Sequence, residues 1–471
     1  MKNVIFALAL VFATLNTSAQ YTKLHDFNSV PDGATPQGNL ISDGTFLYGV
    51  TSKGGAINGG VNNRGTIFKI KPDGTGYAKL FDFDGPVNGS SPLGSLFFDG
   101  TFLYGMTNSG GTNGDGTMFK ILPDGTGFVK LLDFLLTFNG PTGSSPLGSL
   151  ISDGTFLYGM TNGGGTSNDG IIFKIKPDGT GYVKLLDFDE PTTGRSPTGS
   201  LIFDGTFLYG MTNGGSTDCG TIFKIKPDGT GFAKLYDFVS NPDGCTPFGS
   251  LISDGTFLYG MTWGDGTNLN GTIFKIMTNG TGYAKLLDFT GTPDGGRPFG
   301  SLIFDGVFLY GMTSLGGTND LGTIFKIKPD GTGYARLLDF DGTANGSRPQ
   351  GSLISDGTFL YGMTAYGGTK SSGTIFKFQD ISTSIADNNM QSSFNVFPNP
   401  SNGKFTIKNN GLGIPNYKLE IYNVIGEKVY AMDTFHNQTS YDIDLSNSPK
   451  GVYFAKMYEG QTILTKIIVL Q

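Results

Sequence analysis

Residues 149–188 read SLISDGTFLYGMTNGGGTSNDGIIFKIKPDGTGYVKLLDF, and the spacing of apolar and turn residues in this stretch decides the fold. Asp153-Gly154 and the run from Pro177 to Gly181 supply the turn residues that tight hairpins need. The remaining runs are rich in apolar residues, have the length of β-strands and lie at 149–152, 155–161, 171–176 and 182–188. The stretch therefore predicts a sheet of four antiparallel strands.

The same pattern recurs along the chain. The segment Leu-Tyr-Gly-Met-Thr, with Val50 in place of Met in one copy, places its Tyr at positions 48, 104, 158, 209, 259, 310 and 361. Seven copies spaced by about 51 residues indicate a repeat architecture, and four antiparallel strands per repeat are typical of a β-propeller blade. The composition agrees, because 76 Gly and 22 Pro disfavour helices. The sequence therefore predicts an all-β protein with a seven-bladed β-propeller.

The first and last copies are incomplete in complementary ways. The last copy stops at residues 373–378 and lacks its fourth strand, whereas residues 21–27, Tyr-Thr-Lys-Leu-His-Asp-Phe, form a fourth strand that precedes the first complete copy. We therefore expect the N-terminal strand to pair with the last third strand and close the ring. Ring closure also removes exposed sheet edges.

The two ends of the chain differ from the repeats. Residues 1–19 combine Lys2, an apolar run from Val4 to Leu15 and small residues before Gln20, as in a secretory signal peptide. The apolar run is shorter than the roughly 20 residues of a membrane span, so we expect export without a transmembrane anchor. Polar residues 380–393 are typical of a linker, and the alternating runs within 394–471 predict a small immunoglobulin-like β-sandwich. The propeller is assigned to 20–379.

Two resemblances add to this interpretation. The pattern Gly-Thr-Ile-Phe-Lys-Ile-x-Pro-Asp-Gly-Thr-Gly, followed by Leu-Asp-Phe, resembles the GloVer tandem repeat of exported proteins over about 360 residues. The C-terminal segment resembles the type A sorting domain of the type IX secretion system in Bacteroidetes, on Pro398, Asn399, Pro400, Gly403, Gly426, Gly451, Tyr453 and Lys466. The second resemblance implies recognition by the secretion machinery and a secreted or cell-surface protein. The alternative is a carbohydrate-binding or spacer sandwich.

Residues for catalysis are scarce. Only two histidines occur, and His25 stands where other repeats carry Phe, Leu or Tyr, so we interpret it as a packing residue. Glycoside hydrolysis or a lyase reaction by carboxylates stays an alternative, with the non-repeating acids Glu190, Asp218, Asp265 and Asp320 as candidates. We expect that the protein is not an enzyme. The net charge of −7 disfavours nucleic acid as a partner.

The loops after the second and fourth strands vary between copies and should share one face. Their distinctive residues are Trp263, Tyr366, Arg195, Arg297, Arg348 and Asp265. Aromatic rings stack on sugars, and arginines bind carboxylates, so this face is a candidate site for a glycan or protein ligand. Ordinary loop variation is the alternative. The sequence thus allows a binding or display module, a polysaccharide hydrolase, or a purely architectural surface protein.

Two further expectations concern this face. Cys219 and Cys245 precede strands of neighbouring blades, which predicts a disulfide that stabilises the fold by about 3 kcal/mol. Calcium is a weaker expectation, based on oxygen ligands in two loops: Asp82, Asp84 and Asn88, and Asp339, Asp341 and Asn345. Turn formation is the stronger account of these residues. No other metal and no cofactor is expected.

Overall fold

A computed structural model describes most of the repeats and part of the C-terminal segment, and the chain forms two compact units. The repeat unit is Met1–Ile381 and the C-terminal unit is Ser382–Gln471. The predicted signal peptide and the predicted linker beyond Asp380 lie outside the described residues. Those residues are 20–57, 60–61, 63–137, 140–380, 394–397, 401, 403–409, 418–423, 428–432, 440–449, 451–459 and 462–470.

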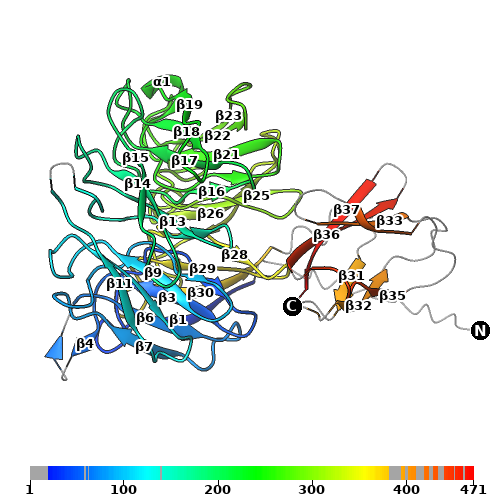
Figure 1. The fold of residues 1–471 in the computed structure, drawn as a ribbon, viewed down its shortest axis with the longest axis horizontal. Helices are drawn as coiled ribbons and strands as arrows, with labels where there is room; N and C mark the ends of the chain where they lie inside the picture. Colours follow the sequence, from blue (N-terminus) through cyan, green and yellow to red (C-terminus); the bar gives the residue numbers. More distant parts are fainter. Residues whose placement is uncertain are drawn as a thin grey trace, which may run out of the picture. The chain divides into compact units, whose positions relative to one another are not determined.

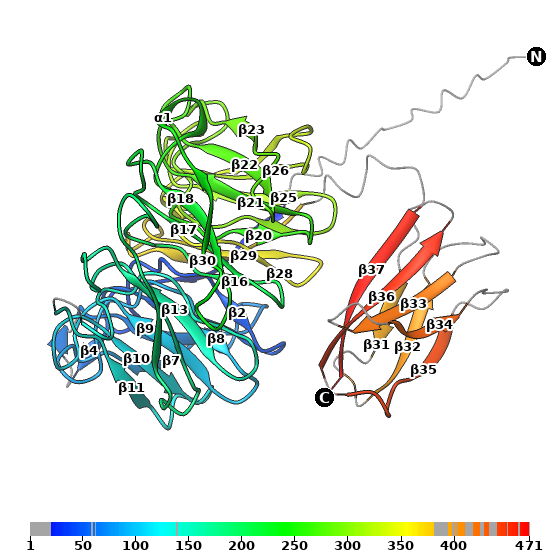
Figure 2. The ribbon, with the colours of Figure 1, turned by 45° about the horizontal axis from the view of Figure 1, so that its top comes forward.

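The described part of the repeat unit contains seven four-stranded antiparallel sheets, which follow one another around a centre (Figures 1 and 2). The first sheet consists of β2 (Ile41–Ser42), β3 (Leu47–Thr51), β6 (Thr66–Ile70) and β7 (Ala78–Asp82), and the second of β8 (Phe97–Phe98), β9 (Leu103–Thr107), β10 (Thr117–Ile121) and β11 (Val129–Asp133). The third consists of β12 (Ile151–Ser152), β13 (Leu157–Thr161), β14 (Ile171–Ile175) and β15 (Val183–Asp187), and the fourth of β16 (Ile202–Phe203), β17 (Leu208–Thr212), β18 (Thr221–Ile225) and β19 (Ala233–Asp237). The all-β class is confirmed.

The fifth and sixth sheets repeat this order, and the seventh combines both ends of the repeat region. The fifth sheet consists of β20 (Ile252–Ser253), β21 (Phe257–Thr262), β22 (Thr272–Met277) and β23 (Ala284–Asp288), and the sixth of β24 (Ile303–Phe304), β25 (Leu309–Thr313), β26 (Thr323–Ile327) and β27 (Ala335–Asp339). The seventh consists of β28 (Ile354–Ser355), β29 (Leu360–Thr364), β30 (Thr374–Gln379) and β1 (Gln20–Asp26). A short hairpin of β4 (Ala56–Ile57) and β5 (Gly60–Val61) and the four-residue helix α1 (Ser240–Asp243) lie between strands.

The middle strands of each sheet are buried on both faces. In β13, Leu157 packs in a cluster with Tyr104 and Met106 of the preceding repeat. The adjacent Tyr158 packs in a different cluster, with Leu208 of the following repeat. Successive side chains of a strand point to opposite faces, so the alternating pattern buries each sheet between its two neighbours.

Strand β1 completes the seventh sheet as the sequence predicts. It runs antiparallel to β30, with Tyr21 opposite Phe378 and Asp26 opposite Thr374. Figure 1 draws this N-terminal strand in blue. The Asp26 carboxylate also accepts hydrogen bonds from the backbone and side chain of Thr369. The N-terminal strand therefore takes the place of the fourth strand that the last repeat lacks.

A cyclic set of hydrogen bonds joins the segments that precede the innermost strands. The Asn39 N–H donates to Ser95 Oγ at 2.7 Å, and the same bond links each repeat to the next. It returns to the first repeat where Ser352 N–H donates to Asn39 Oδ1 at 2.5 Å. The residue before each donor is a glycine. A Cβ atom on Gly94 would lie 2.3 Å from the carbonyl oxygen of Gly148, so this close backbone approach requires glycine.

The C-terminal unit contains two sheets in its described residues. One consists of β31 (Phe394–Phe397), β32 (Lys404–Asn409) and β35 (Ser440–Asp444), and the other of β34 (Lys428–Met432), β33 (Lys418–Asn423), β36 (Gly451–Glu459) and β37 (Thr462–Leu470). Ile407, Leu419 and Ile468 lie in one buried cluster, so both sheets contribute to one core. Among the described residues, no helix has the length and apolar character needed to cross a membrane.

Candidate functional site

A cavity of about 350 Å³ lies where the seven inner segments meet. Its lining includes glycines and hydroxyl side chains of the cyclic hydrogen-bond set, and none of the described residues that line it is charged. The residue before each glycine also lines the cavity, and these seven residues are called the rim. In repeat order, the rim is Gln37, Leu93, Leu147, Thr198, Phe248, Phe299 and Gln350.

The rim contains an aromatic sector formed by Phe248 and Phe299. Their rings stack, with centroids 4.6 Å apart and planes at 17°. Trp263, the only tryptophan of the chain, meets both rings edge-on, with centroids 5.8 and 5.9 Å away. The Arg297 guanidinium lies over the Trp263 ring, 4.5 Å from its centroid. Three aromatic rings and one cation therefore form a compact cluster at one side of the cavity.

The structure divides the six predicted ligand residues into separate groups. Trp263 and Arg297 join the aromatic sector. Tyr366 and Arg348 line a second hollow of about 440 Å³ with Leu321, and Tyr366 is 38% exposed. Arg195 and Asp265 line neither of these hollows. Sequence reasoning missed the two rim phenylalanines, which resemble ordinary core residues unless the seven repeats are aligned on the glycine that follows them.

Arg195 is held by two acids. Its Nε lies 2.7 Å from Glu190 Oε2, and a terminal nitrogen lies 2.8 Å from Asp218 Oδ1. Hydrogen bonds to Asp218 and Glu190 raise the pKa of Arg195 above its ordinary value. This arrangement occupies two of the acids that the hydrolase alternative offers. A third, Asp320, accepts a hydrogen bond from the Gly316 N–H.

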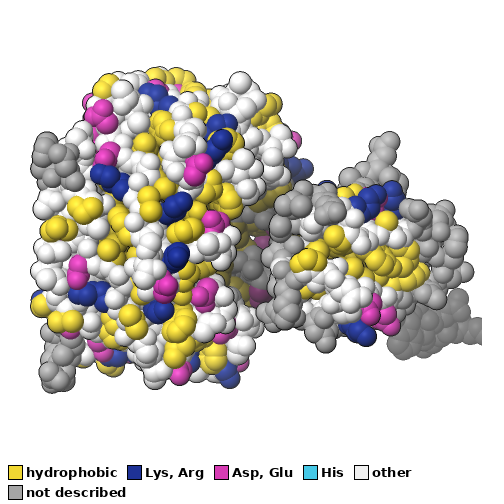
Figure 3. All heavy atoms as spheres, in the orientation of Figure 1, with side chains coloured by type: hydrophobic (Ala, Val, Ile, Leu, Met, Phe, Trp, Pro, Cys, Tyr) yellow, Lys and Arg dark blue, Asp and Glu magenta, His cyan; other side chains and the backbone are white. Residues whose placement is uncertain are grey.

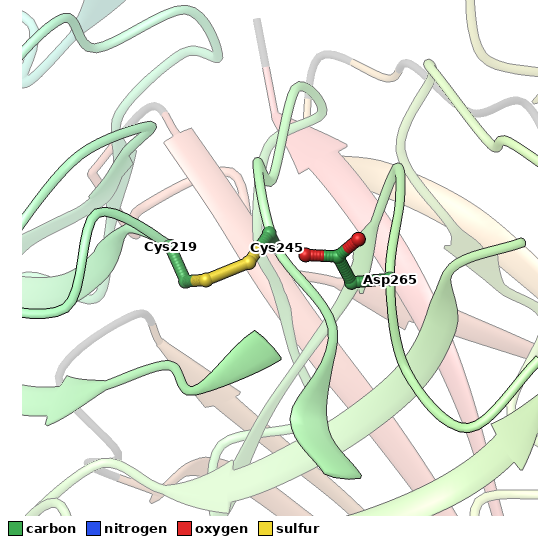
Figure 4. A group of neighbouring side chains, drawn as sticks. All are labelled: Cys219, Cys245 and Asp265. Atoms are coloured by element: carbon green, nitrogen blue, oxygen red, sulfur yellow. A yellow bond between two sulfur atoms is a disulfide. The ribbon is translucent and has the colours of Figure 1, made fainter. Parts of the chain in front are cut away.

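A disulfide joins Cys219 and Cys245, as the sequence predicts, and links the fourth and fifth repeats (Figure 4). The carboxylate of Asp265 lies beside it, with its oxygen and the two sulfur atoms all within 4.8 Å of one another. The Asp265 carboxylate also accepts a hydrogen bond from Ser240 Oγ at 2.8 Å. Because the two sulfurs are bonded to each other, Cys219, Cys245 and Asp265 together form a structural link between loops.

The two loops considered for calcium use their oxygens within turns. Asp84 Oδ1 accepts hydrogen bonds from the N–H groups of Val87 and Asn88, and the Asn88 side chain donates to Asp84 Oδ2. Asp341 caps the equivalent turn at the N–H groups of Ala344 and Asn345. These bonds account for the residues as turn formers. Calcium binding stays an untested expectation.

His25 packs in β1. Its ring stacks on Tyr77 with centroids 3.7 Å apart, and its Nε2 lies 3.5 Å from Asp32 Oδ2. Burial lowers the pKa of His25 below its ordinary value, against the opposing effect of the nearby Asp32 and Asp26 carboxylates. The stacking on Tyr77 agrees with the interpretation of His25 as a packing residue.

Four of the eight sorting-motif residues are described. Gly403 has a positive φ of 98°, and a Cβ there would lie 2.4 Å from Ser446 Cα. Gly451 begins β36, Tyr453 is buried and donates a hydrogen bond to the Pro449 carbonyl, and Lys466 is exposed in β37. The remaining four lie outside the described residues: Pro398, Asn399, Pro400 and Gly426.

Comparisons with protein families match both parts of the chain. Residues 9–134, 129–306 and 250–405 match the Gloeobacter/Verrucomicrobia repeat, and residues 395–471 match a secretion system C-terminal sorting domain. The second match identifies the type IX system as the export machinery and gives the cell surface or the outside of the cell as the destination. No curated protein sequence matches this chain.

Solved structures with a similar arrangement share little sequence. A β-propeller domain of the Trilobed protease from Pyrococcus furiosus has a TM-score of 0.44 and 10% identity, over 73% of this chain and 94% of that chain. An extracellular domain of a one-component system from B. thetaiotaomicron has a TM-score of 0.47 and 9% identity, over 96% of this chain and 58% of that chain. The chain also spans only 43% of the tricorn protease and 58% of TolB from Acinetobacter baumannii. These likenesses concern the fold alone.

Proposed function

The chain belongs to the Gloeobacter/Verrucomicrobia repeat family, and from this premise we propose that it is an exported binding module. In this proposal the repeat unit is a seven-bladed β-propeller closed by β1, and the C-terminal unit is an immunoglobulin-like sandwich that directs secretion. The propeller presents its loop face to a glycan or an extracellular protein, and the chain performs no catalysis.

The closed-propeller part of the proposal is supported by cyclic contacts. The repeat unit has seven four-stranded sheets in its described residues, and β1 pairs with β30. The hydrogen-bond series that begins at Asn39 returns to Asn39 from Ser352. An open arc of sheets would leave its first and last repeats without such a bond.

One observation carries the binding function: the rim of the cavity departs from the repeat, while the backbone that supports it repeats in all seven copies. The seven rim positions hold Gln, Leu, Thr or Phe, although a glycine follows every one. A rigid ring that displays a varied set of side chains around a cavity is suited to ligand recognition.

The distribution of charge favours neither a nucleic-acid partner nor a catalytic role. On the face of the repeat unit drawn in Figure 3, Lys and Arg side chains are interspersed with Asp and Glu side chains. Glu190 and Asp218 meet across the Arg195 guanidinium and form ion pairs with it. A pair of glycosidase carboxylates must instead face a sugar. The proposal therefore assigns these acids to loop structure.

A binding assay with product analysis tests this function. The exported full-length protein is applied to a glycan array and to immobilised cell-surface proteins, and bound and unbound ligands are then compared by mass spectrometry. We expect selective retention of an unchanged ligand. The variant carries Trp263→Asn and Tyr366→Ser, because the equivalent positions elsewhere hold residues such as Asn108 and Ser109.

The control variant is Lys176→Ala, in an exposed hairpin at the opposite end of the strands. Loss of binding in the loop-face variant, with binding kept in the control, supports the proposal. Turnover of a polysaccharide would establish the hydrolase alternative in its place. Retention of nothing, by a folded protein, would leave the architectural role.

A further inference from the structure

The rim of the axial cavity is amphipathic around its circumference. Each rim residue neighbours those of the adjacent repeats, because the glycines that follow them contact one another in repeat order and Gly351 contacts Gly38. Phe248 and Phe299 therefore form one continuous arc. Gln350 and Gln37 form the next arc, and Leu93 and Leu147 follow it. Thr198 separates the leucines from the phenylalanines.

Among the residues that the structure describes, no charged one lines this cavity. The polar groups in its lining are the amides of Gln37, Gln350 and Asn39 and the hydroxyls of serines and Thr198. The Arg297 guanidinium lies over Trp263, and Arg297 is not part of the lining. Because burying an ion without a counter-charge is costly, the cavity favours an uncharged ligand.

The aromatic arc offers a fixed apolar surface. Phe248 and Phe299 are half-buried and line the cavity, so part of each ring is accessible. Trp263 supports both rings from the side, and Arg297 covers Trp263. Rings held in this way lose little freedom when a ligand packs on them. The amide groups of Gln350 and Gln37, on the adjoining arc, can both donate and accept hydrogen bonds.

We propose that the axial cavity binds a neutral sugar ring at the end of a glycan, an inference that rests on the binding function proposed above. A pyranose has an apolar C–H face and a periphery of hydroxyl groups. Its C–H groups pack against the accessible parts of the stacked Phe248 and Phe299 rings, and its hydroxyls bond to Gln350 and Gln37. The cavity volume of about 350 Å³ lies at the lower end of small-molecule sites, about 300–1,000 Å³, and suits one or two sugar units.

The single tryptophan makes the test direct, because all indole fluorescence of the chain comes from Trp263 beside this arc. The full-length protein is titrated with methyl glycosides of glucose, galactose, mannose and N-acetylglucosamine, and with glucuronate and galacturonate. Fluorescence reports occupancy, and isothermal titration calorimetry gives the affinity. We expect at least one neutral glycoside to bind and to change the fluorescence, and the uronates to bind about tenfold more weakly or not at all.

The test variant is Phe248→Leu with Phe299→Leu, which gives the fifth and sixth repeats the residue that Leu93 and Leu147 already place on the rim. It should fold, as checked by its unfolding midpoint, and bind the neutral glycoside about tenfold more weakly, since two aromatic contacts are lost. A second variant, Gln350→Leu, should weaken binding without changing the unbound fluorescence.

Different results overturn this inference and the binding function on which it rests. Equal or tighter binding of uronates, or neutral-sugar binding that the phenylalanine variant leaves unchanged, refutes the inference. If the array finds a glycan or protein whose binding depends on Trp263 and Tyr366 but no glycoside enters the cavity, the inference fails and the binding function stands. Absence of any ligand in both assays removes both.

Discussion

The hairpin ends of the sheets and the rim of the cavity differ in how far their residues vary between repeats. At the hairpin ends of the first five sheets, a lysine of the third strand reaches the turn of the next sheet: Lys69 Nζ donates to the Pro123 carbonyl at 3.1 Å, and Lys174 Nζ donates to the Pro227 carbonyl at 3.0 Å. Both ammonium groups also lie 4.8 Å from a phenylalanine ring. The rim, in contrast, holds four different residue types in its seven positions.

The difference separates the residues that hold the sheets together from those that are free to specify a ligand. Contacts of the hairpin ends and of the glycines that follow the rim residues recur because they join neighbouring sheets. The rim residues stand on that repeated backbone, and their side-chain contacts, such as the stack of Phe248 on Phe299, are not repeated around the ring. Substitutions in the first set should lower stability, and substitutions in the second should change binding and leave stability nearly intact.

The largest loss of stability is expected at Asp380. The seventh sheet lacks the hairpin after β30, and the Asp380 carboxylate accepts from Lys326 Nζ at 2.6 Å in place of a turn carbonyl. Both side chains are 7% exposed. Asp380→Ala removes the counter-ion of a buried ammonium, which costs about 3–5 kcal/mol of the free energy of unfolding. Urea unfolding followed by Trp263 fluorescence measures the loss.

The double variant Asp380→Leu with Lys326→Met provides the matched comparison. Replacing both charges by apolar residues should cost less than removing one, because no buried charge is left without its partner. Equal losses in the single and double variants would contradict this account of the ion pair. The exposed Lys176→Ala variant should unfold at the same urea concentration as the unmodified protein.

The disulfide is the next test, since it lies among the variable loops yet has a stabilising role. Cys219→Ser with Cys245→Ser installs the residue that Ser372 and Ser90 carry at equivalent positions. Loss of a link across a separation of 26 residues should lower the free energy of unfolding by about 3 kcal/mol. Denaturant unfolding of the oxidised protein and the variant gives the difference. Two thiols in the denatured, oxidised protein, or equal stabilities, would contradict the expectation.

Substitution of the glycines that follow the rim residues should have a smaller but clear effect on the free energy of unfolding. Gly94→Ala places a Cβ atom against the backbone of Gly148, which cannot move independently of the ring, so we expect a loss of about 1–3 kcal/mol. Gly264→Ala is the control, because its Cβ meets nothing within 4 Å. Thermal unfolding of both variants separates crowding at the axis from a general cost of replacing glycine. A stable Gly94→Ala variant would show that the ring can expand.

The regular parts of the fold were predictable because their signal is periodic. The alternation around Tyr158 and the turn residues Asp153-Gly154 indicate hairpins locally, and the missing strand after Phe378 matches the extra strand at Tyr21. In the structure, Asp153 caps its turn and accepts a hydrogen bond from the Tyr158 hydroxyl. Local physics was sufficient for these features.

The cavity could not be predicted because it depends on residues more than 50 positions apart. Phe248 and Phe299 have no local mark of a site, and only the packing of the fifth and sixth sheets brings them together beside Trp263. Asp380 was assigned to the linker for its polar surroundings, whereas it pairs with Lys326 inside the repeat unit. Arg195 has the chemistry of a ligand residue but is engaged by Glu190 and Asp218.

The smallest expected effect is a pH dependence that arises from β1. Because burial lowers the pKa of His25 in the folded protein, the unfolded chain binds a proton more readily. Stability should therefore be full above the ordinary histidine pKa, about 6.5, and fall as the pH drops through that value. His25→Leu should remove this part of the pH dependence. Leu132 and Leu186 occupy the equivalent position in other repeats, so the variant keeps the packing.

Free energies of unfolding at pH 8 and pH 5.5, for the protein and the variant, test the sign. We expect similar values at pH 8 and a smaller acid-induced loss in the variant. If acidification stabilises the unmodified protein relative to the variant, attraction between the protonated ring and Asp32 outweighs burial, and His25 acts as a charged link to Asp32. Identical losses would show that protonation of His25 does not weaken its stack on Tyr77. The closing strand β1 would then have the same pH dependence as the six fourth strands that have no histidine.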